Sequence, residues 1–196
     1  MKITAKLVNE LRQRTGIGMM DCKKALEETN GDIEEAIKVL RKKGFERAKK
    51  KMDRETTEGV VGSYIHNNLK LGVLVELNCE SDFVAKNEEF LELVKNVAMH
   101  IAAANPQYVS SEEIPQHVIN EEKDIIREQF KDSNKPAEII DKIVDGKLNK
   151  FYSEVCLVDQ PYIKDDKLTV GKLVASYISK FGENIKINRF ARYSIG

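Results

Sequence analysis

Residues with side chains suited to covalent or metal chemistry are few and scattered in this sequence. The histidines and cysteines are His66, His100, His117, Cys22, Cys79 and Cys156. The cysteines are separated by 57 and 77 positions, which is too sparse for a zinc site or a disulfide framework. The glycine pair Gly16 and Gly18 does not follow a predicted strand, so it is not a phosphate-binding loop. We therefore expect no metal site, no cofactor and no set of catalytic residues.

One pair of reactive residues remains open as an alternative. His66 and Cys79 fall on the two predicted strands of one hairpin, where an imidazole beside a thiol would imitate a nucleophile and its base. Chance proximity explains this pair better than a catalytic role does. An enzyme built on it would have a thiol at Cys79 that reacts near neutral pH.

The stretch that stands out chemically is the loop Ser81, Asp82, Phe83 and Val84. It follows a strand of buried character and precedes a predicted helix that is capped by Asn87. An exposed Phe83 would be an apolar anchor for the pocket of a partner protein, and Asp82 would supply a charge or a hydrogen-bond acceptor. In the alternative interpretation, Phe83 folds back onto its own sheet.

The composition is that of a globular protein with balanced charge. The 196 residues include 32 basic and 32 acidic side chains, and 41% of the residues are hydrophobic. This balance argues against a generally basic nucleic-acid binder and against an acidic disordered chain. No apolar run reaches the roughly 18 residues of a membrane helix, and the N-terminal residues do not resemble a signal segment. We expect a cytoplasmic protein of one domain or two small ones, with no membrane contact and no direct nucleic-acid contact.

The charge is unevenly distributed and suggests a domain boundary near residue 55. Residues 1–54 carry 15 basic and 9 acidic side chains, whereas the remainder carries 17 basic and 23 acidic ones. The basic surplus is concentrated in residues 38–54 and includes the run Lys49-Lys50-Lys51. Aromatic side chains are rare there, so a solvated linker helix explains the run better than a nucleic-acid contact does.

Residues 1–54 have the pattern of a three-helix bundle. A first helix over 3–15 is capped by Thr4, a second is short, and a third starts at the cap Asp32 and is expected to end at Gly44. Met19 and Met20 fall in a predicted glycine-flanked turn between two helices. Flexible methionines there either suit an adaptable contact surface or fill the core of the bundle. The arrangement resembles the ubiquitin-associated type of bundle.

Residues 55–196 predict an α+β core with an antiparallel sheet. Strand formers at 59–66 and 71–79 flank an Asn-Asn turn and indicate a hairpin. Helical patterns follow over 87–105, 118–130, 136–146 and 169–181, and a strand over 184–195 shifts phase as a bulged strand does. The Asp165-Asp166 pair is expected in a solvated turn.

Two ordered motifs resemble those of the elongation factor Ts family. The first runs from Thr15 to Leu26 and reads TGIGMMDCKKAL, and the second runs from Glu76 to Ala85 and reads ELNCESDFVA. The resemblance covers nearly the whole chain. Within these motifs the chain departs from the family at Ser81, where threonine, which is also a small hydroxyl residue, is more usual.

The resemblance implies a guanine-nucleotide exchange factor for elongation factor Tu, the GTPase that delivers aminoacyl-tRNA during protein biosynthesis. It implies that Asp82 and Phe83, flanked by Ser81 and Val84, insert near the magnesium site of that GTPase. The resemblance also implies that the three-helix bundle of residues 1–54, here called the head, contacts the nucleotide domain of the GTPase through Met19 and Met20, with Leu11 as a weaker candidate. The chain is short for the family, which implies a homodimer whose interface includes the strand over 184–195.

Alternatives to this exchange factor remain open on the residues themselves. The head could recruit an unrelated partner while the core serves as an oligomerisation scaffold. A ribosomal factor could use residues 38–54 to contact RNA, and binding would then be salt-sensitive and depend on Lys49, Lys50 and Lys51. The third alternative is the enzyme built on His66 and Cys79.

Overall fold

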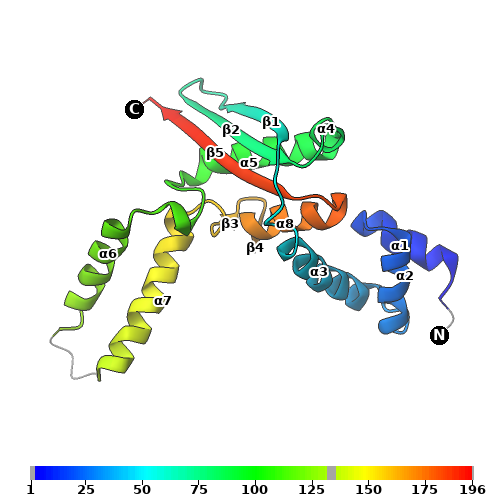
Figure 1. Cartoon of the computed structure of the whole chain (residues 1–196), viewed down its shortest axis with the longest axis horizontal. Helices are drawn as coiled ribbons and strands as arrows, with labels where there is room; N and C mark the ends of the chain where they lie inside the picture. The colour runs from blue at the N-terminus through cyan, green and yellow to red at the C-terminus, as the bar shows by residue number, and fades with distance from the viewer. Residues whose placement is uncertain (1–2, 132–135, 196) are drawn as a thin grey trace. The chain divides into compact units, whose positions relative to one another are not determined.

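The computed structural model describes residues 3–131 and 136–195. The first two residues of the predicted head, residues 132–135 and the last residue of the predicted core lie outside them. Helices and strands come in separate runs along the chain, with three helices before the first pair of strands and a block of helices after it, so the predicted α+β class is confirmed (Figure 1). Two compact units are formed by residues 1–61, 76–94 and 172–187 and by residues 62–75, 95–171 and 188–196.

The first unit contains an N-terminal bundle of α1 (Ala5–Thr15), α2 (Met19–Glu28) and α3 (Ile33–Lys49). The predicted caps are present: the Thr4 hydroxyl accepts a hydrogen bond from the Leu7 amide at 3.3 Å, and an Asp32 carboxylate oxygen accepts one from the Glu35 amide at 3.0 Å. The apolar faces of the three helices meet in one core, whose buried residues are Val8, Leu11, Cys22, Ala25, Leu26, Ala36 and Leu40.

Two predictions about the head were wrong. Met19 and Met20 are the first residues of α2 and do not lie in the preceding turn. Gly44 does not end the third helix, because α3 continues to Lys49. The glycine allows close packing there: a Cβ on Gly44 would lie 2.9 Å from the Ser179 hydroxyl oxygen of α8 (Val170–Phe181).

A three-stranded sheet has the order β1 (Glu58–Ile65), β2 (Leu71–Cys79) and β5 (Ile185–Ser194). The connection between β1 and β2 is only residues 66–70, so these strands form the predicted antiparallel hairpin. Along β5 the burial alternates at its start, with Ile185 and Ile187 buried, and then loses this phase as the sequence indicated.

The second unit contains most of the remaining helices. These are the C-terminal part of α5 (Glu88–Ala104), the short 3-10 helix η1 (Ser111–Glu113), α6 (Gln116–Glu128) and α7 (Ala137–Val155). The prediction that a helix ends at Gly146 was wrong, because α7 continues for nine residues beyond it. Apart from the neighbouring backbone of α7 itself, no heavy atom of the described residues lies within 4 Å of a Cβ built on Gly146, and its backbone does not take the left-handed conformation of a helix stop.

A second, two-stranded sheet in this unit pairs β3 (Pro161–Tyr162) with β4 (Asp165–Thr169) in antiparallel orientation. Asp165 and Asp166 therefore begin a strand, whereas the sequence placed them in a turn. Beside this hairpin, the buried His100 of α5 accepts a hydrogen bond from the Ile163 amide and forms another with the Gln160 side chain. Burial lowers the pKa of His100, so its imidazole is neutral and structural.

Candidate functional site

The predicted loop at residues 81–84 is in fact a single turn of helix. α4 (Asp82–Ala85) follows Ser81, whose hydroxyl oxygen caps the turn by accepting a hydrogen bond from the Val84 amide at 3.4 Å. We call residues 81–86 the Phe83 turn. One helical turn is unstable by itself, because nucleation fixes several residues for a single hydrogen bond. Contacts outside the turn must therefore hold it.

Two faces of the Phe83 turn have opposite surroundings. Val84 and Ala85 are buried beneath it, with 8% and 7% of their surface exposed. Phe83 is 84% exposed, which is the highest value among the large hydrophobic side chains of the described residues. The alternative in which Phe83 folds back onto its own sheet is therefore wrong. An aromatic side chain held in water on a fixed base is available to bury against another protein.

The base of the Phe83 turn is fixed by a carboxylate from a distant part of the sequence. Glu183 accepts two hydrogen bonds from Ser81, one from its backbone amide at 3.0 Å and one from its hydroxyl at 2.7 Å. The Cys79 thiol donates to the Ser81 carbonyl at 3.2 Å. Since bonds to an ionised acceptor are stronger than neutral ones, the bidentate Glu183 contact is the main polar attachment of the turn.

Asp82 is ionised and partly exposed beside Phe83. Its carboxylate accepts a hydrogen bond from the Lys86 ammonium at 2.7 Å, across one helical turn. This bond lowers the pKa of Asp82 below its ordinary value. The Phe83 turn thus presents an aromatic ring and a carboxylate, the latter already paired with a cation that a partner's group can replace.

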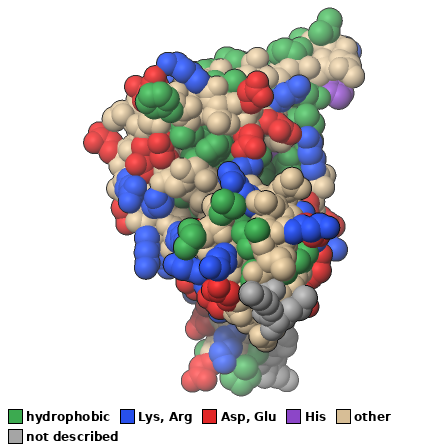
Figure 2. Space-filling model, turned by 90° about the vertical axis from the view of Figure 1, so that its right-hand side faces the viewer, with side chains coloured by type: hydrophobic (Ala, Val, Ile, Leu, Met, Phe, Trp, Pro, Cys, Tyr) green, Lys and Arg blue, Asp and Glu red, His purple; other side chains and the backbone are tan. Residues whose placement is uncertain are grey.

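The candidate contact residues of the head are not all accessible. Met19 and Met20 are 49% and 66% exposed at the start of α2. A bidentate ion pair between Asp21 and Arg47 also joins α2 to α3. Leu11 is fully buried in the core of the bundle. The prediction that Leu11 contacts a partner was therefore wrong, because Leu11 is a core residue. The face viewed in Figure 2 shows scattered apolar side chains among basic and acidic ones.

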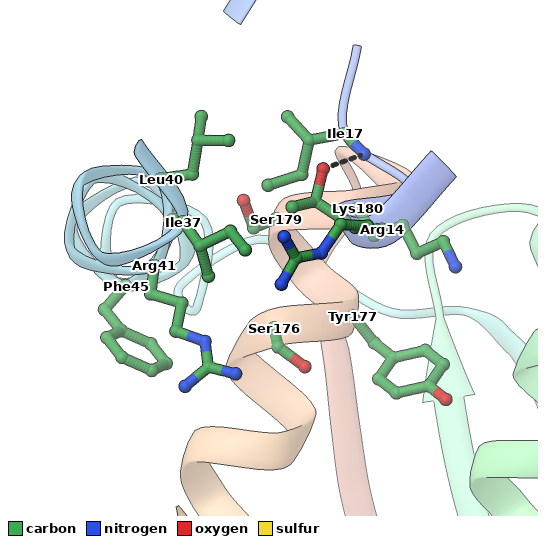
Figure 3. A pocket seen from close by; sticks show the side chains of 12 residues that line it. Arg14, Ile17, Ile37, Leu40, Arg41, Phe45, Ser176, Tyr177, Ser179 and Lys180 are labelled. Carbon is green, nitrogen blue, oxygen red and sulfur yellow. Dashed lines mark hydrogen bonds between the residues drawn. The ribbon is translucent and has the colours of Figure 1, made fainter. Parts of the chain in front are cut away.

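A cavity of about 250 Å³ lies within the first unit, between the end of α1, α3 and α8 (Figure 3). Two of its cations are already paired, Arg14 with Glu34 and Lys180 with Glu89, each at 2.6 Å. The lining includes serine and threonine hydroxyls but no histidine, cysteine or carboxylate to activate them. The cavity lies where the head packs against α8, and its lining residues do not form a catalytic set.

The alternative enzyme built on His66 and Cys79 is disfavoured by the surroundings of both residues. Cys79 is fully buried, and burial together with the nearby Glu183 charge raises the pKa of its thiol to about 11. Its thiol points to the Ser81 carbonyl, and His66 shares a hydrogen bond of 3.0 Å with the Tyr64 hydroxyl. A nucleophilic cysteine needs a lowered pKa and solvent access, and Cys79 has neither.

Metal ligation and membrane insertion find no support in the part of the chain that the structure describes. Within residues 3–131 and 136–195, no group of three or more histidine, cysteine or acidic side chains is arranged to hold a metal ion. Over the same residues, every helix is too short or too polar to cross a bilayer. Lys51 of the basic run donates a hydrogen bond to the Gly182 carbonyl, so it also has a structural role.

Several residues that support the Phe83 turn were not predicted from the sequence. Lys86 follows Asp82 by four positions, and this spacing on a helix would have predicted the ion pair. Glu183 lies 102 positions from Ser81, and no local pattern joins the two. Such a contact depends on the tertiary fold and leaves no trace in the periodicity of the sequence.

Comparison with known proteins agrees with the two motifs. The family model described as elongation factor TS matches residues 2–196. Elongation factor Ts of Thermosipho melanesiensis is 58% identical over 194 residues, covering 99% of both chains. The protein of the same name from Fervidobacterium nodosum is 55% identical over the full length of both chains, and that of Geobacter sulfurreducens is 55% identical over 91% of its own length. The chain belongs to the elongation factor Ts family, whose members act in translation elongation.

Proposed function

We propose that this member of the elongation factor Ts family is the guanine-nucleotide exchange factor of elongation factor Tu. In this proposal the chain speeds the release of GDP by disturbing the magnesium and nucleotide site of the GTPase, and no covalent bond is made or broken. It needs no cofactor of its own and acts in the cytoplasm, where translation takes place. The observation that carries the proposal is Phe83, which is 84% exposed on a turn whose other face is buried.

The energetics of exchange require more than one contact. GDP bound at about nanomolar affinity corresponds to about 12 kcal/mol. The factor by which the chain weakens GDP equals the factor by which GDP weakens the chain, and a 10⁴-fold effect needs about 5.5 kcal/mol of differential binding. Burial of one phenylalanine supplies about 1.5–3 kcal/mol, so Phe83 has to act together with other surfaces.

The two residues of the proposed insertion have different roles. Phe83 supplies apolar area that a pocket of the GTPase buries only when that pocket opens. Asp82 supplies negative charge near the bound cation, because its lowered pKa keeps the carboxylate ionised at neutral pH. Ser81 and Val84 support the pair, the first by capping α4 and the second by filling the space beneath it.

The head supplies the second surface in this proposal. Residues 1–54 act as a docking module and residues 55–196 as the core that carries the Phe83 turn. Met19 and Met20 are exposed together at the start of α2, and flexible methionines adapt to a partner surface. Their contact adds affinity for the GTPase, while the Phe83 turn adds the preference for its nucleotide-free state.

The test measures release of a fluorescent GDP from elongation factor Tu by stopped flow, over a range of concentrations of the chain. Phe83→Ala should lower the maximal release rate by about 10- to 100-fold, which is the factor that loss of its burial predicts. Asp82→Ala should also lower the maximal rate. The half-saturating concentration, which reports binding to the GDP-bound GTPase, should stay nearly constant for both.

A matched control is Ile125→Ala, which removes an apolar side chain that is 56% exposed on α6. This variant should leave both kinetic constants unchanged. If Phe83→Ala raised the half-saturating concentration and kept the maximal rate, Phe83 would be an ordinary interface residue. If the unaltered chain did not speed release at all, the exchange function itself would be wrong.

The proposed homodimer is supported by an exposed apolar face in the second unit. Five large side chains of the hairpin tip and the C-terminal strand segment are 49–78% exposed, namely Ile65, Leu69, Leu74, Tyr193 and Ile195. They line an open cavity of about 360 Å³. The Ile195 amide donates to the Lys70 carbonyl at 2.9 Å, which keeps strand and hairpin tip together. Contiguous apolar surface of this kind is typical of protein interfaces.

The dimer is tested by sedimentation equilibrium of the full chain. Leu74→Lys places a charge in the centre of the apolar face and should convert a dimer to a monomer. The same substitution at an exposed position of α6, Ile125→Lys, should leave the mass unchanged. A chain that is monomeric without any substitution would contradict the proposal.

A further inference from the structure

The loop that follows α8 contacts two segments that are distant in sequence, and we call its residues 182–184 the anchor loop. It begins at Gly182, where the backbone takes a left-handed conformation with φ of 76° and ends α8. This conformation is one that glycine adopts without strain. The chain then turns away from the helix axis and enters β5, with Glu183 and Asn184 in the bend.

Asn184 fixes the anchor loop to the segment that follows α3. It is 2% exposed, and its side-chain amide donates hydrogen bonds to the carbonyls of Met52 at 3.0 Å and Arg54 at 2.7 Å. Its backbone amide donates to a Glu80 carboxylate oxygen at 2.6 Å. Both hydrogens of a buried amide are thus used, and rotation of Asn184 would break several bonds at once.

Glu183 therefore projects from a fixed backbone toward the Phe83 turn. Its two oxygens accept the amide and the hydroxyl of Ser81, so the hydroxyl hydrogen is committed to Glu183. The remaining lone pairs of the same hydroxyl face the Val84 amide and cap α4. One carboxylate consequently holds the backbone at Ser81 and also orients the group that starts the helical turn.

We propose that Glu183 is a positioning residue for the insertion of Phe83 and Asp82. It does not touch the GTPase, and it acts by holding Ser81 so that the Phe83 turn keeps one orientation before the partner is met. This inference rests on the proposed exchange function. A side chain that is ordered in advance loses less conformational entropy on binding, so more of its burial energy remains to favour the nucleotide-free state.

The first test needs no partner and uses the absence of tryptophan from the sequence. Phe83→Trp makes residue 83 the single tryptophan, and time-resolved fluorescence anisotropy then reports its local motion. In this background Glu183→Gln should increase the amplitude of the fast decay at least twofold, because a glutamine amide offers only one acceptor to the two donors of Ser81. Glu121→Gln, at an exposed position of α6, is the control and should leave the decay unchanged.

The second test measures GDP release with Phe83 restored. Glu183→Gln should lower the maximal release rate by about tenfold, in the range that loss of a charge-assisted hydrogen bond predicts, while the half-saturating concentration stays unchanged. Ser81→Ala should have a similar effect, whereas Ser81→Thr should keep most of the release rate because it keeps the hydroxyl. In the Ser81→Ala background, Glu183→Gln should lower the release rate by a smaller factor than it does in the unaltered chain.

The outcomes separate this inference from the exchange function. If Phe83→Ala slows release but Glu183→Gln changes neither the release rate nor the anisotropy, Glu183 is not a positioning residue and the exchange function stands. If the factors by which Glu183→Gln and Ser81→Ala lower the release rate simply multiply in the double variant, Glu183 does not act through Ser81. If the unaltered chain does not speed release, the exchange function fails, and the anisotropy result still decides whether Glu183 orders residue 83.

Discussion

Two glycines inside long helices give a matched test of how the head is held on the core. Gly44 in α3 is buried, and a Cβ there would lie 2.9 Å from the hydroxyl oxygen and 3.2 Å from the Cβ of Ser179. Gly146 in α7 has open space around the same position. Alanine gains about 1 kcal/mol over glycine in a helix interior, so Gly146→Ala should stabilise its helix by about 0.5–1 kcal/mol.

For Gly44→Ala the same gain is opposed by overpacking, which costs about 1–3 kcal/mol in a well-packed contact. The net effect should lie between about zero and a 2 kcal/mol loss. The difference between the two variants should therefore be at least about 1 kcal/mol. This difference is expected only if α3 packs against α8, because the chemical change is the same in both helices.

Native-state amide hydrogen exchange is the suitable measurement, because it gives the opening free energy of each helix separately. Opening free energies of α7 should rise in Gly146→Ala, and those of α3 should fall or stay constant in Gly44→Ala. If Gly44→Ala stabilised α3 as much as Gly146→Ala stabilises α7, the close packing of α3 on α8 would be refuted. The head would then be free of the core at this point.

Three further predictions concern single side chains. Burial lowers the pKa of His100 in the folded state, so the unfolded chain binds a proton at a higher pH than the folded chain does. The free energy of unfolding should therefore fall as the pH drops below about 6.5, and it should fall less in His100→Gln. Urea unfolding at pH 5–7 measures both. The pKa of the buried Cys79 thiol is raised to about 11, so this thiol should resist a thiol-specific reagent at pH 7.5 and react only after denaturation. Rapid modification of Cys79 in the native chain would contradict its burial. Lys86→Ala should return the pKa of Asp82 toward its ordinary value without changing the melting temperature. Carboxyl NMR titration and calorimetry measure the two quantities. An unchanged titration would mean that the ion pair of Asp82 and Lys86 is not formed in solution.

Local signals in the sequence predicted much of the fold. The caps Thr4, Asp32 and Asn87 are followed by helices, because a side-chain oxygen in the residue before a helix satisfies one of its free amides. The hairpin at 58–79 followed from two runs of strand formers on either side of a polar turn. These features depend on neighbours within a few positions, and they can therefore be seen in the order of the residues.

Contacts between distant segments could not be predicted in this way. Gly44 and Gly146 are both glycines at which a helix was predicted to end. Only the tertiary structure shows that Gly44 lies against Ser179 and that Gly146 faces open space. The bonds from Glu183 and Asn184 span 102 to 132 positions. The prediction of an exposed Phe83 depended on a family resemblance, since composition alone favoured neither burial nor exposure.

The place of Phe83 on α4 explains why an aromatic side chain stays exposed beside an apolar core. Successive residues of a helix are rotated by about 100°, so a turn that buries Val84 and Ala85 directs Phe83 away from the core. Turning Phe83 inward would expose Val84, whose burial is worth a similar 1.5–3 kcal/mol, and it would also break the contact of Ser81 with Glu183. The core therefore gains little by taking up the ring. The burial energy of Phe83 remains available to a partner, and only the part realised in the nucleotide-free complex alone can speed the release of GDP.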